Sequence, residues 1–370
     1  MKQRPSFPFL ALAVVFRVLV ASPLAAESST PQLESLIAAA ETNPKIPGGS
    51  VRVVENGEIV FDRYFGTLAA QAAPPWNEAT VVAIASISKS ITATLVAVLV
   101  GEGTLSFDDP IAGYLPEYAE LKLQKNGRPV RSPTIAECLS HTSGLPGGTM
   151  SSLPRQSPLR RGDQAEVARH FATQGLATRP GTKYAYSFRG YAAVSRVVEV
   201  ATGRPFVEVL QEKLLSPLGM SETTFTPDVS LARRIPAYAT RTTGLNDDEV
   251  AAQINRFRDQ RGPFVNAAGA LFSTPDDLQR FLQFHADKGL VGDTLIVPHD
   301  VLAQLYEPQP AAPQYGLGFA LRAGTVVGHG GATGTSVNVD LSNGQILIVL
   351  TQAGAANARP LTAGATRIIF

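Results

Sequence analysis

The sequence predicts an α+β fold, in which an antiparallel sheet formed from both chain ends is flanked by helices and carries a mostly helical inserted region. Near the start, residues 48–66 hold β-branched runs on either side of Asn56-Gly57, a pair typical of a tight hairpin turn. Near the end, residues 325–352 contain three more short strands. Strands followed by helices and then by strands favour α+β packing over a strand–helix–strand repeat.

Between the strands, apolar residues recur at helical spacing. Ile87, Ile91 and Leu95 are four residues apart and define one face of a helix that ends near Gly101. We expect further helices within residues 132–141, 190–203, 205–215 and 274–289. The expected division is an α/β part, about residues 27–105 and 260–370, and a helical part, about residues 106–259, with a site in the cleft between them.

The composition is that of a globular protein with a sizeable core. Of 370 residues, 44% are hydrophobic and 17% are charged, and the formal net charge is +1. Short basic clusters such as Arg160-Arg161 are typical of solvated surface, and no basic stripe suited to nucleic acid is found. Cys138 is the only cysteine, so no internal disulfide is expected, and its apolar helical context indicates a core residue.

The first 26 residues have the layout of a secretory signal peptide. Basic residues precede an apolar run, and small residues mark a cleavage point after Ala26. The mature chain is then residues 27–370, exported to the periplasm or secreted. Arg17 and Pro8 interrupt the apolar run, so no stable membrane span is expected after cleavage. An uncleaved anchor is the alternative.

A candidate nucleophile lies at the start of the apolar helix. Ser86 and Lys89 are three residues apart, so they share a helix face. A serine hydroxyl needs a neighbour to take its proton, and a lysine does so only when its pKa falls from about 10.4. Burial and the positive end of the helix dipole both lower that pKa. The alternative interpretation of this pair alone is a helix cap with the lysine extended to water.

The neighbouring residues strengthen the first interpretation. The segment "VVAIASISKSITA" resembles the nucleophile segment of the serine β-lactamase and penicillin-binding-protein superfamily. The resemblance is to its class C-like branch, which includes D-aminopeptidases, D-alanyl-D-alanine carboxypeptidases and family VIII-type esterases. Further segments match in the family's order over roughly residues 48–352: "TIAECLSHTSGLP", "PGTKYAYSFRGYAAVSRVVEVATGRPF", "SPLGMSETTF", "AAGALFSTPDDLQRFL", "YGLGF" and "VGHGGATG".

The resemblance implies roles for the residues that carry out proton transfer. Ser86 matches the acylated nucleophile, and Lys89 matches its proton acceptor or electrostatic partner. Tyr186 matches the tyrosine of a Tyr-x-Asn motif, which shuttles protons between nucleophile and leaving group. Whether Lys89 or Tyr186 is the general base stays open, because coupled groups need not titrate singly. Tyr184 and Tyr191 match core positions.

The resemblance also implies a strand that lines the site. His329, Gly330 and Gly331 match a His-x-Gly motif, written Lys-Thr-Gly in many relatives, and the two glycines are expected to contact substrate. The backbone amides of Ser86 and Ala332 are expected to form the oxyanion hole.

One position departs from the family pattern. The family's Tyr-Ser-Asn is here Tyr186-Ser187-Phe188, so the asparagine that donates to a substrate amide carbonyl is missing. Losing such a donor costs about 1–3 kcal/mol when the partner is left unpaired. With Phe188 expected to contact substrate in a more apolar pocket, the sequence favours an ester over an amide or lactam.

The other histidines indicate no metal site. His141 is expected to be a structural hydrogen-bonding residue, and the rest have no zinc-ligand spacing: His170, His285 and His299. Residues 143–163 are rich in Gly, Pro and Ser and form either a lid or a disordered surface excursion.

The sequence therefore predicts an exported serine hydrolase that needs no metal or cofactor. It acts through an acyl-enzyme on an ester, or on a β-lactam or D-amino-acid peptide amide. The alternative is a non-catalytic protein that binds cell-wall peptide or penicillin and retains the fold. The sequence does not indicate the natural substrate or the oligomeric state.

Overall fold

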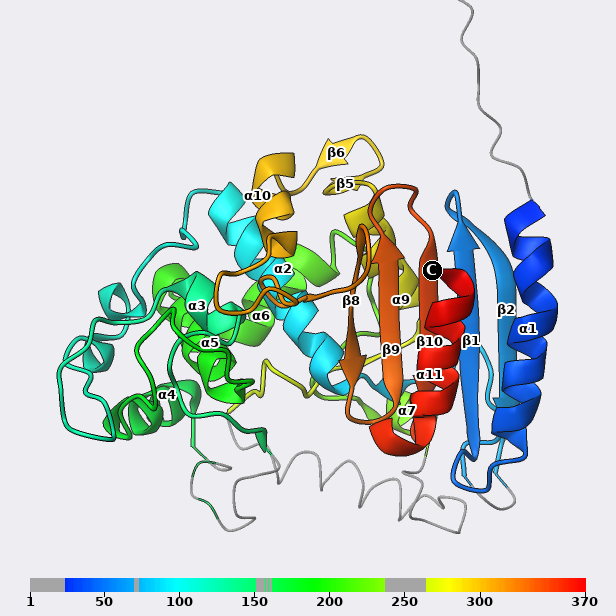
Figure 1. Ribbon diagram of the computed structural model, residues 1–370, viewed down its shortest axis with the longest axis horizontal. Helices are drawn as coiled ribbons and strands as arrows, with labels where there is room; N and C mark the ends of the chain where they lie inside the picture. Colours follow the sequence, from blue (N-terminus) through cyan, green and yellow to red (C-terminus); the bar gives the residue numbers. More distant parts are fainter. Residues whose placement is uncertain (1–23, 70–72, 151–156, 158, 160–161, 237–263) are drawn as a thin grey trace, which may run out of the picture.

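The computed structural model describes residues 24–69, 73–150, 157, 159, 162–236 and 264–370. Its main sheet has six strands in the order β2-β1-β10-β9-β8-β7, and every neighbouring pair is antiparallel. The first two strands and the last four of the chain thus lie side by side (Figure 1). The strands are β1 Gly48–Glu55, β2 Glu58–Gly66, β7 Ala320–Leu321, β8 Val326–Gly331, β9 Thr335–Asp340 and β10 Ile346–Thr351.

The hairpin predicted at residues 48–66 is confirmed. Asn56 and Gly57 both have positive φ angles, 52° and 81°, as a two-residue turn of this type requires. The three strands predicted within residues 325–352 are confirmed as β8, β9 and β10. Together these elements form the sheet that the sequence predicted from the two chain ends.

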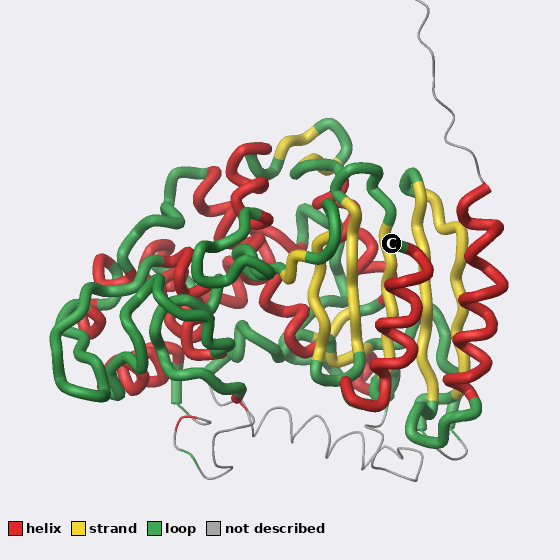
Figure 2. The backbone as a smooth tube through the Cα atoms, viewed as in Figure 1, coloured by secondary structure: helices red, strands yellow, loops and turns green. Residues whose placement is uncertain are grey.

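Helices cover both faces of the sheet (Figure 2). Along β10, Leu347 and Val349 belong to a core shared with α1 (Leu24–Glu41) and α11 (Ala355–Ile369). Ile346, Ile348 and Leu350 face the larger core on the other side, which includes α9 (Pro275–Ala286). This alternation follows from the period of two along a strand.

The helical part shares that larger core, which continues into the buried faces of its helices. Its helices are α3 Ile135–Leu139, α4 Gln164–Thr173, α5 Phe188–Thr202, α6 Phe206–Leu210 and α7 Val229–Ala232. Helix α2, Ser88–Gly101, lies between this part and the sheet, and all its residues from Ser88 to Leu99 are buried. The smaller elements are β3 Val82–Ala83, β4 Phe272–Ser273, β5 Leu290–Val291, β6 Thr294–Leu295 and α10 His299–Ala303.

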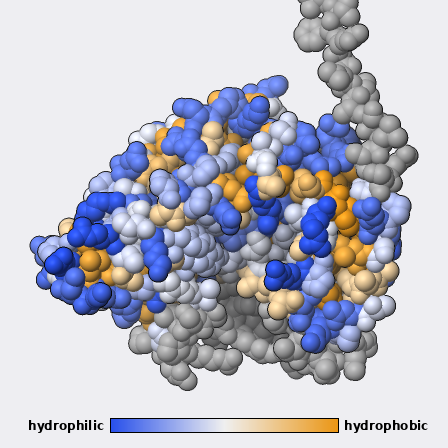
Figure 3. Space-filling model, viewed as in Figure 1, coloured by the Kyte–Doolittle hydropathy of each residue, from blue (hydrophilic) through white to orange (hydrophobic). Residues whose placement is uncertain are grey.

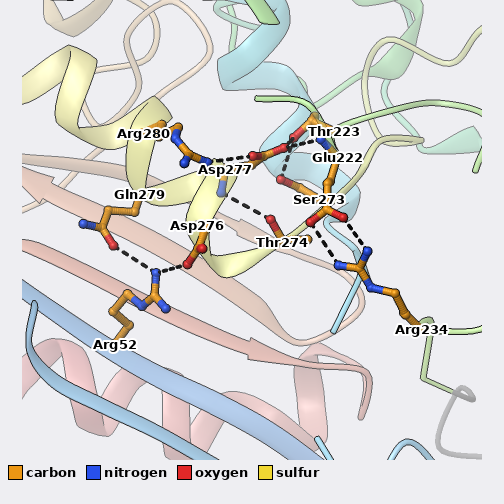
Figure 4. Close-up of polar contacts among 10 residues, drawn as sticks. All are labelled: Arg52, Glu222, Thr223, Arg234, Ser273, Thr274, Asp276, Asp277, Gln279 and Arg280. Carbon is orange, nitrogen blue, oxygen red and sulfur yellow. Dashed lines mark hydrogen bonds and ion pairs between the residues drawn. The ribbon is translucent and has the colours of Figure 1, made fainter. Parts of the chain in front are cut away.

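A polar network fastens the start of α9 to its surroundings (Figure 4). The buried Arg52 on β1 donates to Asp276 at 2.6 Å. The next residue, Asp277, accepts from the Thr223 hydroxyl at 2.8 Å and from the Glu222 N–H at 2.9 Å. These bonds cross from α9 to the sheet and to the chain before α7, so they fix the segment that leads into α9.

The expected signal peptide lies mostly outside the described residues. Helix α1 begins at Leu24, so the expected cleavage point after Ala26 falls within its first turn. Of the loop expected at residues 143–163, residues 151–156, 158, 160 and 161 also lie outside the described part. In the part of the chain that is described, no helix combines the length and the hydropathy needed to cross a membrane.

Candidate active site

Ser86 lies in a short 3-10 turn, Ala85–Ile87, directly before α2. The predicted helix therefore starts two residues after Ser86, and the preceding Ala85 has a φ of 47°. Ser88 holds this turn in place, because its hydroxyl donates to the Ala85 carbonyl at 2.7 Å and accepts from the Leu271 N–H at 3.1 Å. The turn presents Ser86 at the end of a buried helix.

Lys89 reaches back to Ser86 from the first turn of α2. Its Nζ lies 3.3 Å from Ser86 Oγ and 2.7 Å from the Ala268 carbonyl oxygen. The side chain is 2% exposed, and burial lowers its pKa to about 7. A neutral amine donates to the Ala268 carbonyl and keeps a lone pair for the Ser86 hydroxyl proton.

Tyr186 contacts both of these residues. The Ser86 side chain lies near enough to this phenol to favour its ionised form, and the ring centroid lies 4.6 Å from Lys89 Nζ. Burial raises the pKa of this phenol to about 12. At neutral pH the site thus holds an amine that is partly deprotonated and a phenol that keeps its proton.

His329 lies on β8 and is 6% exposed. Its Nδ1 is 2.7 Å from the Gly330 carbonyl, and its Nε2 is 2.9 Å from the Tyr315 hydroxyl. Burial, and then the charge of Lys89, lower its pKa to about 3. The neutral ring donates from Nδ1 and accepts at Nε2, so it brings no positive charge to the site.

The end of β8 lies directly against the nucleophile turn. A Cβ on Gly331 would come within 2.6 Å of the Ile84 carbonyl and 2.1 Å of Thr335 Oγ1, so only glycine allows this approach. The Thr335 hydroxyl also donates to the Ile84 carbonyl at 3.2 Å. Ala332, the expected second amide of the oxyanion hole, follows immediately after this contact.

His141 lies at the centre of an aromatic cluster and is buried. Its Nδ1 accepts from the Ser187 N–H at 3.1 Å, and its ring centroid is 4.3 Å from that of Tyr186. Burial and the nearby Lys89 keep its pKa well below the usual range. This neutral, packed ring agrees with the structural role expected for His141.

Tyr184 and Tyr191, the tyrosines on either side of Tyr186 in the sequence, differ in burial. Tyr191 is fully buried and donates to the Leu139 carbonyl at 2.7 Å, which confirms the predicted core position. Tyr184 is 38% exposed, so its assignment to the core was wrong. It follows the turn at residues 180–182, and its ring edge faces His141 with a centroid separation of 5.8 Å.

Phe188 does not have the surroundings that the sequence predicted. The side chain is 2% exposed and packs perpendicular to Phe171 of α4, with ring centroids 5.3 Å apart. It begins α5, and its ring belongs to the core of the helical part. Its burial contradicts the expected substrate contact, although position 188 still supplies no amide donor.

Sequence reasoning missed three contributions to this site. The Ala268 carbonyl accepts from Lys89, Tyr315 holds His329, and Gly318 lets the backbone pass close to α2. A Cβ on Gly318 would lie 2.9 Å from the Lys89 carbonyl. The segments that contain these residues matched the family, but a backbone acceptor has no residue signature, and only folding brings Tyr315 to His329.

A serine hydroxyl beside a desolvated lysine and a phenol is an arrangement that can activate the hydroxyl as a nucleophile. The chain belongs to the beta-lactamase family, whose model matches residues 33–367. Within the described residues, no group of three His, Cys, Asp or Glu side chains is arranged to hold a metal ion.

Known relatives span several hydrolase activities. Penicillin-binding protein 4 of Amycolatopsis lactamdurans is 29% identical over 86% of this chain and 84% of that protein. The D-alanyl-D-alanine-carboxypeptidase/endopeptidase AmpH of Escherichia coli is 26% identical over 64% of this chain, but only 56% of that protein is spanned. Esterase EstB of Burkholderia gladioli is 27% identical over 74% of each chain.

The fold has close structural neighbours as well. The hydrolase EstCE1, described as having promiscuous acyltransferase activity, superposes with a TM-score of 0.75 at 18% identity. The match covers 94% of this chain and all of that one. At this identity the likeness shows the fold alone.

Proposed function

We propose that the protein hydrolyses carboxylic esters through an acyl-enzyme on Ser86. One observation carries this proposal: Lys89 Nζ lies 3.3 Å from Ser86 Oγ in a site that lowers the lysine pKa to about 7. A general base is most effective when its pKa is near the working pH.

The residues divide the proton transfers between them. Ser86 Oγ attacks the ester carbonyl as its proton passes to Lys89, and the amides of Ser86 and Ala332 hold the oxyanion. Tyr186, protonated at neutral pH, donates to the leaving alcohol and regains a proton from Lys89. Water then attacks the acyl-enzyme, and the acid is released. This assignment makes Lys89 the base and Tyr186 the proton donor.

The preference for an ester rests on position 188. The amide donor of the family motif is absent there, so an amide or lactam carbonyl loses a partner that an ester does not need. The sequence also favoured an ester because Phe188 was expected to form an apolar wall of the pocket. The burial of Phe188 removes this second reason. A peptidase that acts on D-amino-acid peptides is the second candidate, because relatives carry such names.

We also propose that the enzyme is exported. The support is the signal-like residues 1–26 together with relatives named as penicillin-binding proteins and carboxypeptidases. Export would bring the site to cell-wall peptides as well as to external esters.

The test compares three probes on one preparation. The protein, Ser86→Ala and the control Ser342→Ala, a surface serine in the turn after β9, are incubated with a p-nitrophenyl ester, nitrocefin and a fluorescent penicillin. We expect ester turnover in the wild type and in Ser342→Ala, and none in Ser86→Ala. Penicillin labelling without turnover would favour the binding protein, and ester turnover that survives in Ser86→Ala would overturn the proposal.

A further inference from the structure

A groove lies on the face of the sheet that α11 covers. It has a volume of about 550 Å³, within the range of small-molecule sites, and is bounded by β8, β9 and one side of α11. Glycines on β8 open it: a Cβ on Gly330 would meet nothing nearer than 3.7 Å. One end of this groove contains Gly331 and Ala332, so it begins at the expected oxyanion hole.

Three arginines line the groove, and no acidic residue does. Arg322 enters from the end of β7, and Arg359 and Arg367 lie on the groove side of α11. Figure 3 shows strongly hydrophilic side chains gathered where α11 lies over β9. Since the whole chain carries a net charge of only +1, this concentration is local.

Arg322 is the best defined of the three. Its Nε donates to Asn338 Oδ1, and Asn338 Nδ2 in turn lies 3.5 Å from Thr366 Oγ1 of α11. All three arginine side chains are exposed. No carboxylate of the described residues forms an ion pair with Arg322, Arg359 or Arg367. An anionic ligand in the groove can therefore reach these guanidinium groups and form charge-assisted hydrogen bonds with them.

The strand register gives the distance between the Arg322 end of the groove and the end at the expected oxyanion hole. Gly331 pairs with Thr335, and Gly328 pairs with Asn338. The three-residue offset along β9 corresponds to about 10 Å at the usual strand rise. The Arg322 end is therefore about this far along the sheet from the oxyanion end.

We propose that Arg322 and Arg367 bind an acidic group of the substrate, a carboxylate or a phosphate, at the end of the groove remote from Ser86. This proposal rests on the proposed ester hydrolysis and names a class of ester for it. Two guanidinium groups at one end of a groove suit the paired oxygens of either acid. The linker between this acid and the scissile carbonyl spans about 10 Å, the length of an extended chain that follows β9.

The kinetic test varies charge and length separately. The substrates are the mono-p-nitrophenyl esters of suberate and succinate, the uncharged p-nitrophenyl octanoate, and the ω-phosphono analogue of the suberate ester. The variants are Arg322→Gln, Arg367→Gln and Arg322→Lys, with the exposed Arg128→Gln as control. Arg367 is exposed, so its substitution tests the groove even where Arg322→Gln lowers stability.

We expect each Gln variant to lower kcat/KM about tenfold for the suberate ester, as the loss of one charge-assisted contact implies. For p-nitrophenyl octanoate and the short succinate ester, kcat/KM should change less than about twofold. Arg322→Lys should retain part of the activity on the suberate ester. A larger effect on the ω-phosphono ester identifies phosphate as the preferred group. Equal losses on charged and neutral esters, or no loss on either, would overturn the proposal.

A binding measurement separates this inference from the proposed reaction. Suberate is titrated into Ser86→Ala and into Ser86→Ala combined with Arg367→Gln, with heat as the readout. Binding that the second substitution weakens supports the groove even where no ester is hydrolysed. If the wild type hydrolyses esters but Ser86→Ala does not bind suberate, the proposed acid-binding role of the groove is refuted. The proposed ester hydrolysis is then unaffected.

Discussion

Lys89 is the residue on which the proposed chemistry depends. Its amine is buried in the first turn of α2, and its two polar contacts are a serine hydroxyl and a backbone carbonyl. The described surroundings provide no carboxylate partner for this amine, and its burial lowers its pKa. The spacing of Ser86 and Lys89 predicted their proximity, but the carbonyl of Ala268, 179 residues away in the chain, could not be predicted.

The lowered pKa of Lys89 predicts a dependence of stability on pH. The folded amine releases its proton near pH 7, whereas the unfolded amine holds it until about pH 10.4. Between these values the unfolded state binds more protons, so stability rises with pH, by at most about 1.4 kcal/mol per pH unit. Lys89→Met removes this contribution.

Urea denaturation at pH 7, 8 and 9 measures the effect. The free energy of unfolding of the wild type should rise relative to that of Lys89→Met at each step. Parallel pH profiles for the two proteins would show that Lys89 keeps an ordinary pKa in the folded state.

Tyr186→Phe tests the proton donor. The substitution keeps the ring beside Lys89 and His141 and removes the phenol hydroxyl near Ser86. We expect kcat for a p-nitrophenyl ester to fall by about 10² to 10⁴, the usual contribution of a positioned acid, with KM little changed. An alkyl ester, whose leaving alcohol is more basic, should lose more. An unchanged kcat on both esters would exclude Tyr186 from proton transfer.

At the scale of elements, the close approach of β8 to the nucleophile turn shapes the site. Gly331 and Gly330 provide a matched pair of substitutions on one strand. A Cβ on Gly331 would clash with the backbone of Ile84, whereas one on Gly330 would make only an ordinary van der Waals contact with the Thr335 carbonyl oxygen, at 3.7 Å. Gly331→Ala should therefore displace Ala332 from the oxyanion position and lower kcat about 10²-fold or more.

Gly330→Ala should retain kcat on a neutral ester within about threefold, because nothing near it has to move. Steady-state kinetics on both variants, with circular dichroism to confirm folding, checks the pair. Equal activity of the two variants would mean that the contact between β8 and the turn does not hold the oxyanion site.

The elements also show what sequence patterns can and cannot predict. Helical periodicity located α2, α5 and α9, and the Asn56-Gly57 turn located the first hairpin, because these signals are local. Phe188 was misplaced because a motif position does not state which way a side chain points. The N-cap at Ser187 starts α5 with that ring turned toward Phe171.

At the scale of the whole molecule, the site depends on segments from both ends and the middle of the chain. The proposed catalytic side chains come from the turn before α2, from α2 itself and from the turn before α5, and β8 places His329 beside them. That the sheet is built from both chain ends was predicted from the strand-like segments, but the strand order and the polar contacts across the molecule were not predicted. The network around Asp277 joins residues 55 positions apart and has no signal in either segment alone.

Asp277→Ala tests the contribution of this network to stability. The substitution leaves the Glu222 N–H and the Thr223 hydroxyl without their acceptor in a buried setting, and we expect a loss of about 2–3 kcal/mol in unfolding free energy. The control is Asp300→Ala, an exposed aspartate in the first turn of α10, with an expected change below about 0.5 kcal/mol. Thermal denaturation of both variants measures the difference in stability. Equal denaturation midpoints would show that the network around Asp277 does not stabilise the fold.

The rate of acylation as a function of pH reports whether the neutral Lys89 amine takes the proton of Ser86. Rapid-quench measurement of acyl transfer from a p-nitrophenyl ester to Ser86 is made between pH 5 and pH 9. If the neutral Lys89 amine takes the serine proton, the rate rises about tenfold per pH unit below its pKa of about 7 and levels off above it. An acylation rate that stays constant across this range, with the acyl group on Ser86, would contradict the account.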